Sequence, residues 1–352
     1  MMLVTSTRTA GVVAYALALA AVALIAAGLL HVSGYDVVQS ARALWGGAFG
    51  SVDAFVSSTL VRATPLLIMG SAVALAFRVG VFNVGGDGQF LVGAAASTWV
   101  AIMSSTLPRG VAIPLALAAG AVAGALWGAL PALFRRHWSV FEVLTTLMMN
   151  FIAAHLISYL VRGPLQEPTR VYPQSQTISD ALQLPVIFPG GRLHAGFFIA
   201  LFCAVGVWLW LSRRSGGFNA RVTGANPLAA ASAGRIDTSA VAFRVFVAGA
   251  ALCGLAGAVE VLGVTFALYE NLSPGYGFTA IAVALLAGLH PLGVLVSAVC
   301  LAALDAGASA MQREAGVPSV TVWVIQALLV LAALAAHALR NRTWRSVRLA
   351  QS

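Results

Sequence analysis

Residues 111–134 read VAIPLALAAGAVAGALWGALPALF, a run of 24 residues that contains no charged side chain and is closed by two arginines. A membrane-spanning helix needs about 20 apolar residues, so this run predicts one helix that crosses a bilayer. Gly120, Gly124 and Gly128 recur within it at four-residue spacing. This spacing predicts a flat helix face that another backbone approaches closely, which we interpret as ordinary helix packing.

The apolar character extends over the whole chain. Of its 352 residues, 60% are hydrophobic and 9% are charged, and the mean hydropathy is +0.92. Soluble domains carry about 25% charged residues, and disordered chains have low hydrophobicity, so the composition excludes both classes. We predict an all-α, polytopic transmembrane helix bundle of about ten spans, in which residues 1–352 form a single domain.

The charged residues exclude several activities. All 20 basic residues are arginine, and there is no lysine. A phosphate-binding P-loop needs its lysine, so the chain is not expected to be a standard ATPase, and Schiff-base chemistry is excluded as well. The three cysteines lie in apolar runs and match no metal-ligand spacing, which predicts neither a structural disulfide nor a metal site.

The apolar runs predict the positions of the spans. The expected spans are residues 10–30, 59–77, 89–103, 111–134, 140–161, 195–211, 240–264, 278–289, 291–308 and 319–339. A secretory signal peptide is the alternative for the first run, but the run is longer than the usual apolar core of about 7–15 residues. The eighth and ninth segments are short, so one of them could be a broken or re-entrant helix.

The distribution of arginine predicts the orientation. With the N-terminus inside, 13 of the 20 arginines fall on the cytoplasmic side and 7 on the outer side, as the positive-inside rule expects. The net charge of +9 therefore does not indicate nucleic-acid binding. Both termini and the segment 212–238 are predicted to be cytoplasmic, and residues 31–58 and 162–194 are predicted to be external loops.

A glycine-rich break, FNVGGDGQ at residues 82–89, separates two predicted spans. It is not a dinucleotide-binding loop, because Leu91 stands where that pattern needs glycine. At membrane depth such a break is tolerated only inside protein or along a cavity, and broken helices build transporter sites. The alternative is a tight cytoplasmic turn in which Asp87 caps a helix in water. The residues favour neither interpretation.

Two further sets of polar residues lie within predicted spans. Glu142, Thr146 and Asn150 share one helical face, and they either line a pathway or make interhelical hydrogen bonds. Glu260 and Asp305 are expected to face a cavity or a partner, because a bare charge within a bilayer is costly. A second break, at residues 273–277, indicates an internal repeat around a central pathway. The single histidines at 155, 290 and 337 are interpreted as interfacial or as hydrogen-bonded within the protein.

A short helix is predicted within the cytoplasmic segment 212–238. Asn226 suits an N-cap, Pro227 a first helical residue and Gly234 a C-terminal stop. A helix of about seven residues is unstable alone in water. Either a partner protein or the chain's own cytoplasmic face must hold it.

Together these motifs resemble the permease subunits of bacterial ABC importers, in the group that serves nucleosides, ribose-type sugars and branched-chain amino acids. Residues 82–89 resemble the family's Phe-Asn-Ile-Gly-Ala-Glu-Gly-Gln signature, with Gly-Asp in place of Ala-Glu. Residues 142–150 resemble its fifth-span motif, residues 224–236 its coupling helix, and residues 290–293 a shorter motif. The Gly-Gln and Thr-Thr-x-x-x-Asn patterns point to the nucleoside-type branch.

The resemblance implies a permease subunit, not an enzyme, in the bacterial cytoplasmic (inner) membrane. It would translocate a nucleoside or a related small polar solute, such as a sugar, delivered by an extracytoplasmic solute-binding protein. The implied partners are an ABC ATPase chain, which binds ATP and Mg, a second and related but non-identical permease, and membrane lipid. No cofactor in this chain, no metal and no nucleic acid are expected.

The candidate residues follow from the motifs. The expected substrate pathway consists of Asn83, Asp87, Gln89, Thr146, Asn150 and Glu260. The expected ATPase-coupling residues are Asn226, Pro227, Ala230, Gly234 and Arg235.

Two other classes of function were weighed. A secondary, ion-coupled transporter would use Asp87, Glu260 or Asp305 as its ion site. A membrane-embedded enzyme would need a catalytic cluster, and the sequence contains none. The sequence leaves the solute open among nucleosides, nucleobases and pentoses.

Overall fold

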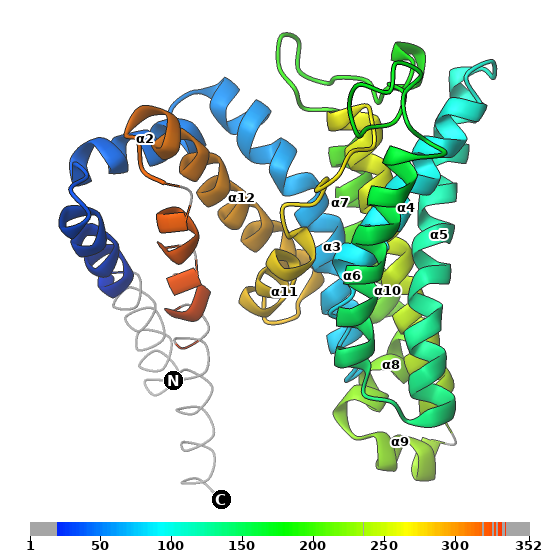
Figure 1. Cartoon of the computed structure of the whole chain (residues 1–352). Coiled ribbons are helices and arrows are strands. Elements are labelled where there is room, and N and C mark those ends of the chain that lie inside the picture. Colours follow the sequence, from blue (N-terminus) through cyan, green and yellow to red (C-terminus); the bar gives the residue numbers. More distant parts are fainter. Residues whose placement is uncertain are drawn as a thin grey trace, which may run out of the picture. The chain divides into compact units, whose positions relative to one another are not determined.

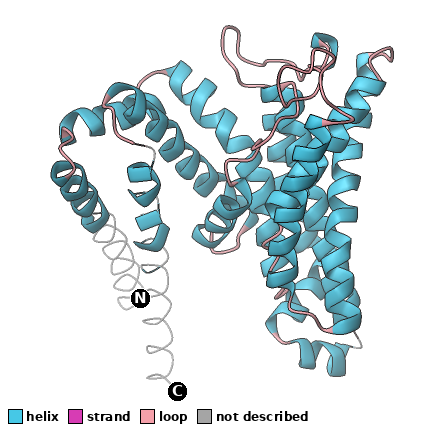
Figure 2. Ribbon diagram, in the orientation of Figure 1, coloured by secondary structure: helices cyan, strands magenta, loops and turns pink. Residues whose placement is uncertain are grey.

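The computed structural model describes residues 20–234, 236–318, 320–325, 327–328, 330–332 and 335. Within these residues every regular element is a helix, and β pairing is limited to isolated bridges in loops (Figures 1 and 2). This confirms the all-α prediction. The chain divides into two compact units, Leu60–Ala302 and a smaller unit formed by Met1–Thr59 with Ala303–Ser352.

The larger unit contains the motifs that the sequence singled out. Its helices are α3 (Val61–Phe77), α4 (Gly86–Met103), α5 (Arg109–Trp138), α6 (Glu142–Arg162), α7 (Gly196–Arg213), α8 (Ser215–Ala225), α9 (Pro227–Gly234), α10 (Thr238–Glu260), α11 (Tyr276–Leu286) and the first part of α12 (Pro291–Glu314). A π-helical turn, Val261–Thr265, extends α10, and a 3-10 turn, Asp180–Leu182, interrupts the loop before α7.

Six helices in the described residues are long and apolar enough to cross a membrane. They are Ala54–Phe77, Arg109–Trp138, Glu142–Arg162, Gly196–Arg213, Thr238–Thr265 and Pro291–Glu314. Helix α4 is not among them, because the polar residues and glycines of its first turn lower its mean hydropathy. The first and last predicted spans fall partly outside the described residues. Six candidate spans therefore stand against the predicted ten.

The two short segments after residue 277 differ from each other. Helix α11 has 11 residues, which extend roughly 17 Å, about half of the hydrocarbon core. Helix α12 has 24 residues and continues to Glu314, beyond the predicted end at residue 308. Of these two segments, α11 is therefore the one that is too short to cross the hydrocarbon core as a single helix.

Glycines bring the backbones of α4, α5 and α10 into direct contact. A Cβ atom on Gly254 of α10 would collide with the carbonyl oxygen of Gly120 and lie 2.8 Å from the Cα of Gly124, both on α5. Gly93 of α4 also lies against Gly254 and close to Gly120, and Gly257 faces the carbonyl oxygen of Phe90. The predicted flat face of α5 is confirmed, since only glycine permits this approach.

The segment 212–238 contains two helices where the sequence predicted one. Helix α9 matches the predicted short helix. Helix α8 was not predicted, because its sequence, SGGFNARVTGA, has little apolar periodicity. It is held by close backbone contacts, since Gly217 lies against Leu211 and Gly224 lies against the carbonyl group of Arg78.

The two predicted external loops have different outcomes. Residues 31–58 contain the helix α2 (Val37–Phe49), whose N-cap Asp36 accepts a hydrogen bond of 2.9 Å from the backbone N–H of Gln39. Residues 163–195 form a loop apart from the 3-10 turn, and its backbone pairs with the segment after α10, through Ser175 with Leu268 and Leu184 with Leu262.

We expect Gly254→Ala to lower the stability of the folded chain by about 1–3 kcal/mol or more, because the added methyl group must displace two neighbouring backbones. Gly206→Ala is the matched control, since no heavy atom lies within 4 Å of a Cβ built at Gly206 on α7. The measurement is the thermal midpoint of the monodisperse peak in detergent. Equal midpoints for the two variants would show that the α5–α10 contact is loose.

Candidate functional site

The start of α4 is tied to the break before it by two side-chain amides. Asn83 donates to Gln89 Oε1 at 2.9 Å, and Gln89 donates back to Asn83 Oδ1 at 3.1 Å. Asn83 Oδ1 also accepts from the backbone N–H of Gly85 at 3.0 Å. Both side chains are buried, with 4% and 1% exposed. The reciprocal pair satisfies buried polar groups that water cannot reach and fixes the turn.

Asn150 joins α6 to the same break. Its Oδ1 atom accepts from the backbone N–H of Gly88 at 2.8 Å, and its Nδ2 atom donates to the carbonyl oxygen of Val84 at 3.0 Å. The first backbone N–H groups of a helix have no partner within that helix. No side chain at the N-cap of α4 bonds to its first N–H groups. Asn150, which belongs to α6, therefore provides part of this cap.

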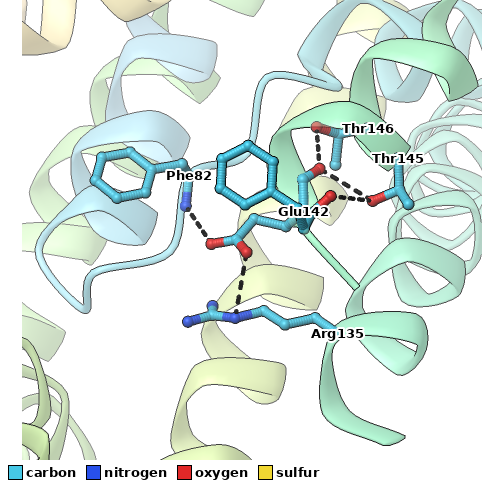
Figure 3. A network of polar contacts seen from close by, with 6 residues as sticks. Phe82, Arg135, Glu142, Thr145 and Thr146 are labelled. Atoms are coloured by element: carbon cyan, nitrogen blue, oxygen red, sulfur yellow. Dashed lines mark hydrogen bonds and ion pairs between the residues drawn. The ribbon is translucent and has the colours of Figure 1, made fainter. Parts of the chain in front are cut away.

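Glu142 connects the beginning of α6 to two other segments (Figure 3). One carboxylate oxygen accepts from the backbone N–H of Phe82 at 3.4 Å, and the other lies 3.5 Å from Nε of Arg135. Thr146 donates to the carbonyl oxygen of Glu142 within the same helix at 2.7 Å. Of the two interpretations of this stripe, interhelical bonding holds for Glu142, whereas Thr146 bonds within its own helix and packs against Gly85.

The two glycine-containing breaks of the chain meet at Asp87. Its carboxylate accepts from the hydroxyl of Ser273 at 2.6 Å and from the backbone N–H of Gly277 at 3.0 Å. Ser273 Oγ in turn accepts from the backbone N–H of Tyr276 at 3.2 Å. The side chain of Asp87 is buried, with 8% exposed. The alternative of a solvated turn is therefore wrong, and the break is one inside the protein.

A cavity of about 490 Å³ lies beside this junction. Its apolar lining includes Leu91, Phe151 and Phe278. Its polar and charged lining consists of Asp87, Asn150, His155, Ser158, Arg162, Glu270, Asn271 and Ser273. Small-molecule sites typically measure about 300–1,000 Å³ and combine apolar walls with a few polar groups. The cavity has the size and the chemistry of a site for a small polar solute.

An ion pair lies at the end of the cavity where α6 ends. Arg162 contacts Glu270 in bidentate fashion, Nε to Oε1 at 2.7 Å and Nη2 to Oε2 at 3.0 Å. The hydroxyl of Ser158 donates to the same carboxylate. The hydrogen bonds from Arg162, and then that from Ser158, lower the pKa of Glu270 to about 2. The carboxylate is therefore ionised throughout the physiological pH range, and the pair persists there.

The structure brings together only part of the predicted pathway. Asp87 and Asn150 line the cavity, whereas Asn83, Gln89 and Thr146 are used in the framework beside it. Glu260, at the end of α10, does not line this cavity; it is buried, and Arg62 and Arg192 interact with its charge.

Sequence reasoning missed several residues that line the cavity: His155, Ser158, Arg162, Glu270 and Ser273. A signal for part of this set was present. Positions 150, 154, 158 and 162 continue the four-residue spacing of the stripe on α6, and all four line the cavity. Glu270 and Ser273 lie in an irregular segment that carries no such periodicity.

The expected coupling residues form one short element. Asn226 caps α9 by accepting from the backbone N–H of Ala229 at 3.0 Å, Pro227 is its first residue and Gly234 its last. Ala230 is buried, and its carbonyl oxygen accepts from the backbone N–H of Ile236. Arg235 lies outside the described residues. In the part of the chain that the structure describes, no cluster of histidine, cysteine and acidic residues could hold a metal ion.

We expect Asn150→Ala to destabilise the chain by about 1–3 kcal/mol, because it leaves a buried N–H and a buried carbonyl group without partners. Thr145→Ala is the control on the same helix, since Thr145 Oγ1 bonds only to carbonyl groups of its own helix or cap. Thermal midpoints in detergent compare the two variants. A midpoint for Asn150→Ala equal to that of the control would contradict the capping role.

Comparison with known proteins agrees with this architecture. Residues 55–334 match the family model described as "Branched-chain amino acid transport system / permease component". No solved structure is significantly similar to the chain.

Three relatives cover most of the chain. The guanosine ABC transporter permease protein NupP of Bacillus subtilis is 38% identical over 332 residues, 93% of each chain. The glucose ABC transporter permease protein TsgB13 of Haloferax volcanii is 38% identical over 328 residues, 90% of this chain and 83% of the relative. The nucleoside ABC transporter permease protein NupB of Lactococcus lactis is 30% identical over 316 residues, 87% of this chain and 86% of the relative. The chain therefore belongs to the family of permease components of branched-chain amino acid transport systems.

Proposed function

We propose that this permease is the translocation subunit of an ABC importer for a nucleoside, with a sugar as the related alternative solute. Relatives of equal identity are named for guanosine and for glucose. The importer takes its solute from an extracytoplasmic binding protein and moves it past the junction of α4, α6 and α11.

The cavity beside Asp87 carries the proposal. Asp87 and Asn150 offer acceptors and donors to hydroxyl groups and to the edge of a base, and Ser158 adds a hydroxyl. Phe151 and Phe278 contribute two aromatic rings to the same walls. A nucleoside has both a flat base that stacks on aromatic rings and a ribose with hydroxyls, whereas a hexose has hydroxyls and C–H groups but no flat base. The mixed lining favours the nucleoside.

ATP hydrolysis is assigned to a separate chain. With no lysine in the sequence, a P-loop is absent, so the partner ATPase binds ATP and Mg, and this chain needs no cofactor. Helix α9 is the proposed docking element, with Asn226, Pro227, Ala230, Gly234 and Arg235 in or next to it. Its Leu228 is 81% exposed, which suits a residue that a partner covers.

The remaining features of the assembly follow from the distribution of arginine and from the family. Residues 1–352 form one permease domain of about ten spans in the bacterial inner membrane, with both termini cytoplasmic, as the positive-inside rule favours. A second, related permease completes the pathway, membrane lipid surrounds both, and nucleic acid has no part.

A secondary, ion-coupled transporter is the alternative. It would need an acidic residue free to exchange an ion, and Asp87, Glu260 and Asp305 were the candidates. Asp87 Oδ1 accepts hydrogen bonds from both Ser273 and Gly277, which ties this carboxylate to the start of α11 and the segment before it. An importer depends on ATP and not on an ion gradient, and this difference separates the two functions.

The test is uptake of radiolabelled guanosine and glucose by proteoliposomes that hold the permease with its co-purified subunits and binding protein. We expect guanosine to accumulate only with ATP, vanadate to stop uptake, and ionophores to leave it unchanged. Uptake that follows an ion gradient without ATP would establish the secondary carrier instead. Uptake of glucose without uptake of guanosine would indicate that the solute is a sugar.

The variant Phe278→Leu, measured in the same uptake assay, tests whether the solute binds in the cavity. Loss of a stacking ring is expected to reduce guanosine uptake about tenfold, since base stacking contributes about 1–3 kcal/mol. Phe198→Leu is the matched control: Phe198 is 58% exposed on α7 and does not line the cavity. Equal uptake by both variants would place the solute elsewhere.

Leu228→Asp is expected to abolish co-purification of the ATPase without unfolding the permease, because a charge replaces an exposed apolar contact on α9. Val171→Asp makes the same kind of change at a residue that is 67% exposed in the loop 163–195, at the opposite end of the larger unit from α9 (Figure 1). Mass spectrometry of the purified complex gives the readout. Retention of the ATPase by Leu228→Asp would exclude α9 as the docking element.

A further inference from the structure

A second cavity, of about 360 Å³, lies at the end of the larger unit that carries α8 and α9. Four segments enclose it: the turn after α3, the C-terminal end of α5, the junction of α8 with α9, and the N-terminal turns of α10. None of the residues proposed for the solute pathway lines it. The walls contain two guanidinium groups, several hydroxyls and the ring of Phe243.

The charge in this cavity is positive and only partly compensated. Arg135 and Arg136 both line it, and no acidic residue does. Glu142 contacts Arg135 through Nε alone, at 3.5 Å (Figure 3). Arg136 makes no ion pair in the described part of the chain, and its guanidinium lies 5.7 Å from the centre of the Phe243 ring. Asp237 precedes the cavity-lining residue Thr238 in the sequence, and its carboxylate caps α10.

Two residues that line the cavity carry buried hydrogen-bond donors without partners. Nη1 of Arg135 is buried and has no partner among the described residues, and neither does the hydroxyl of Thr223. Thr223 is only 4% exposed. An unsatisfied buried donor is costly, so two of them on residues that line one cavity indicate that a ligand with acceptor atoms belongs there.

The N-terminus of α10 adds to this preference. Thr238 and Ser239, its first two residues, line the cavity. The dipole of a helix favours negative charge at its N-terminus, and the carboxylate of Asp237 already accepts from the N–H group of Ala240 there. The hydroxyl groups of Thr238 and Ser239 are therefore the donors that this end of α10 offers. Arg135 and Arg136 add planar donors that suit phosphate oxygens. Together, the hydroxyl and guanidinium donors favour a ligand that carries phosphate oxygens.

We propose that this cavity binds a phosphate group, held by Arg135, Arg136, Thr223 and the start of α10. The volume of the cavity leaves room for a substituent on the phosphate, so the group belongs either to an anionic phospholipid or to a soluble phosphate compound. Gly224 and Pro227 also line the cavity, so the ligand contacts the junction between α8 and α9. The site is independent of the solute pathway and of the nature of the solute.

The test measures binding to the full-length permease, purified and delipidated in a non-ionic detergent. The probes are inorganic phosphate, dioctanoyl phosphatidylglycerol and, as a probe without phosphate, dioctanoylglycerol. We expect one saturable site per chain for at least one phosphate-bearing probe and none for dioctanoylglycerol. Saturable binding of inorganic phosphate identifies a soluble ligand; binding of the phospholipid alone identifies a lipid headgroup; either outcome supports the proposal.

Matched variants locate the site. Arg136→Gln is expected to weaken binding about tenfold, and Thr223→Val several-fold, through loss of a charged and a neutral donor respectively. Arg213→Gln, which removes an exposed charge in the last turn of α7 outside the cavity, is expected to leave binding unchanged. Arg136 is exposed, so Arg136→Gln retains the fold and decides the matter even if Thr223→Val does not fold.

Three results would overturn the proposal. The first is that neither phosphate-bearing probe binds saturably. The second is that dioctanoylglycerol binds as tightly as the phospholipid, which would indicate an apolar lipid contact. The third is that Arg136→Gln and Arg213→Gln weaken binding equally. This would show that the positive charge of the surface in general, and not this cavity, attracts the probe.

Discussion

The contact of α10 with α4 and α5 through glycine is the constraint on which the larger unit depends. Between helices in a bilayer the hydrophobic effect gives little attraction, because lipid is as apolar as the side chains, so close backbone packing has to supply it. Gly254 lies against Gly120 and Gly124 on one helix and Gly93 on another. This contact holds α4 against α10, and the beginning of α4 is where the polar network forms.

The polar network solves a problem that the glycine-rich break creates. A helix that starts inside the protein leaves N–H groups without partners, and water does not replace them. Asn150 bonds to Gly88, and Asp87 bonds to Gly277 at the start of α11. The same two side chains line the cavity beside them. The proposed solute contacts therefore fall on side chains that also hold the framework together.

Helix α6 has a charged contact at each end. Glu142, its first residue, lies near Arg135, and Arg162, its last residue, pairs with Glu270. The first contact involves an arginine of the proposed phosphate site, and the second borders the proposed solute site. Any displacement of α6 along its axis would alter both contacts, so this helix physically links the two ends of the larger unit.

The sequence by itself determined the features that depend on local pattern. Long apolar runs require helices in a membrane, because only a helix satisfies its own backbone there. The four-residue spacing of Gly120, Gly124 and Gly128 predicted a close helix contact, and Asn226 and Pro227 predicted the start of α9. Each of these signals lies within one segment, and the motif resemblance led to the family that the comparisons establish.

Tertiary structure alone decided which polar residues meet. Ser273 bonds to Asp87 across 186 positions, and Glu270 pairs with Arg162 across 108. No periodicity in either segment encodes such a pair, because helix packing sets the distance between them. The same holds for α8, whose glycines pack against α7 and the turn after α3, and for α2, which was interpreted as a loop. Contacts between distant segments also decided that Asp87 and Asn150 line the cavity and that Glu260 does not.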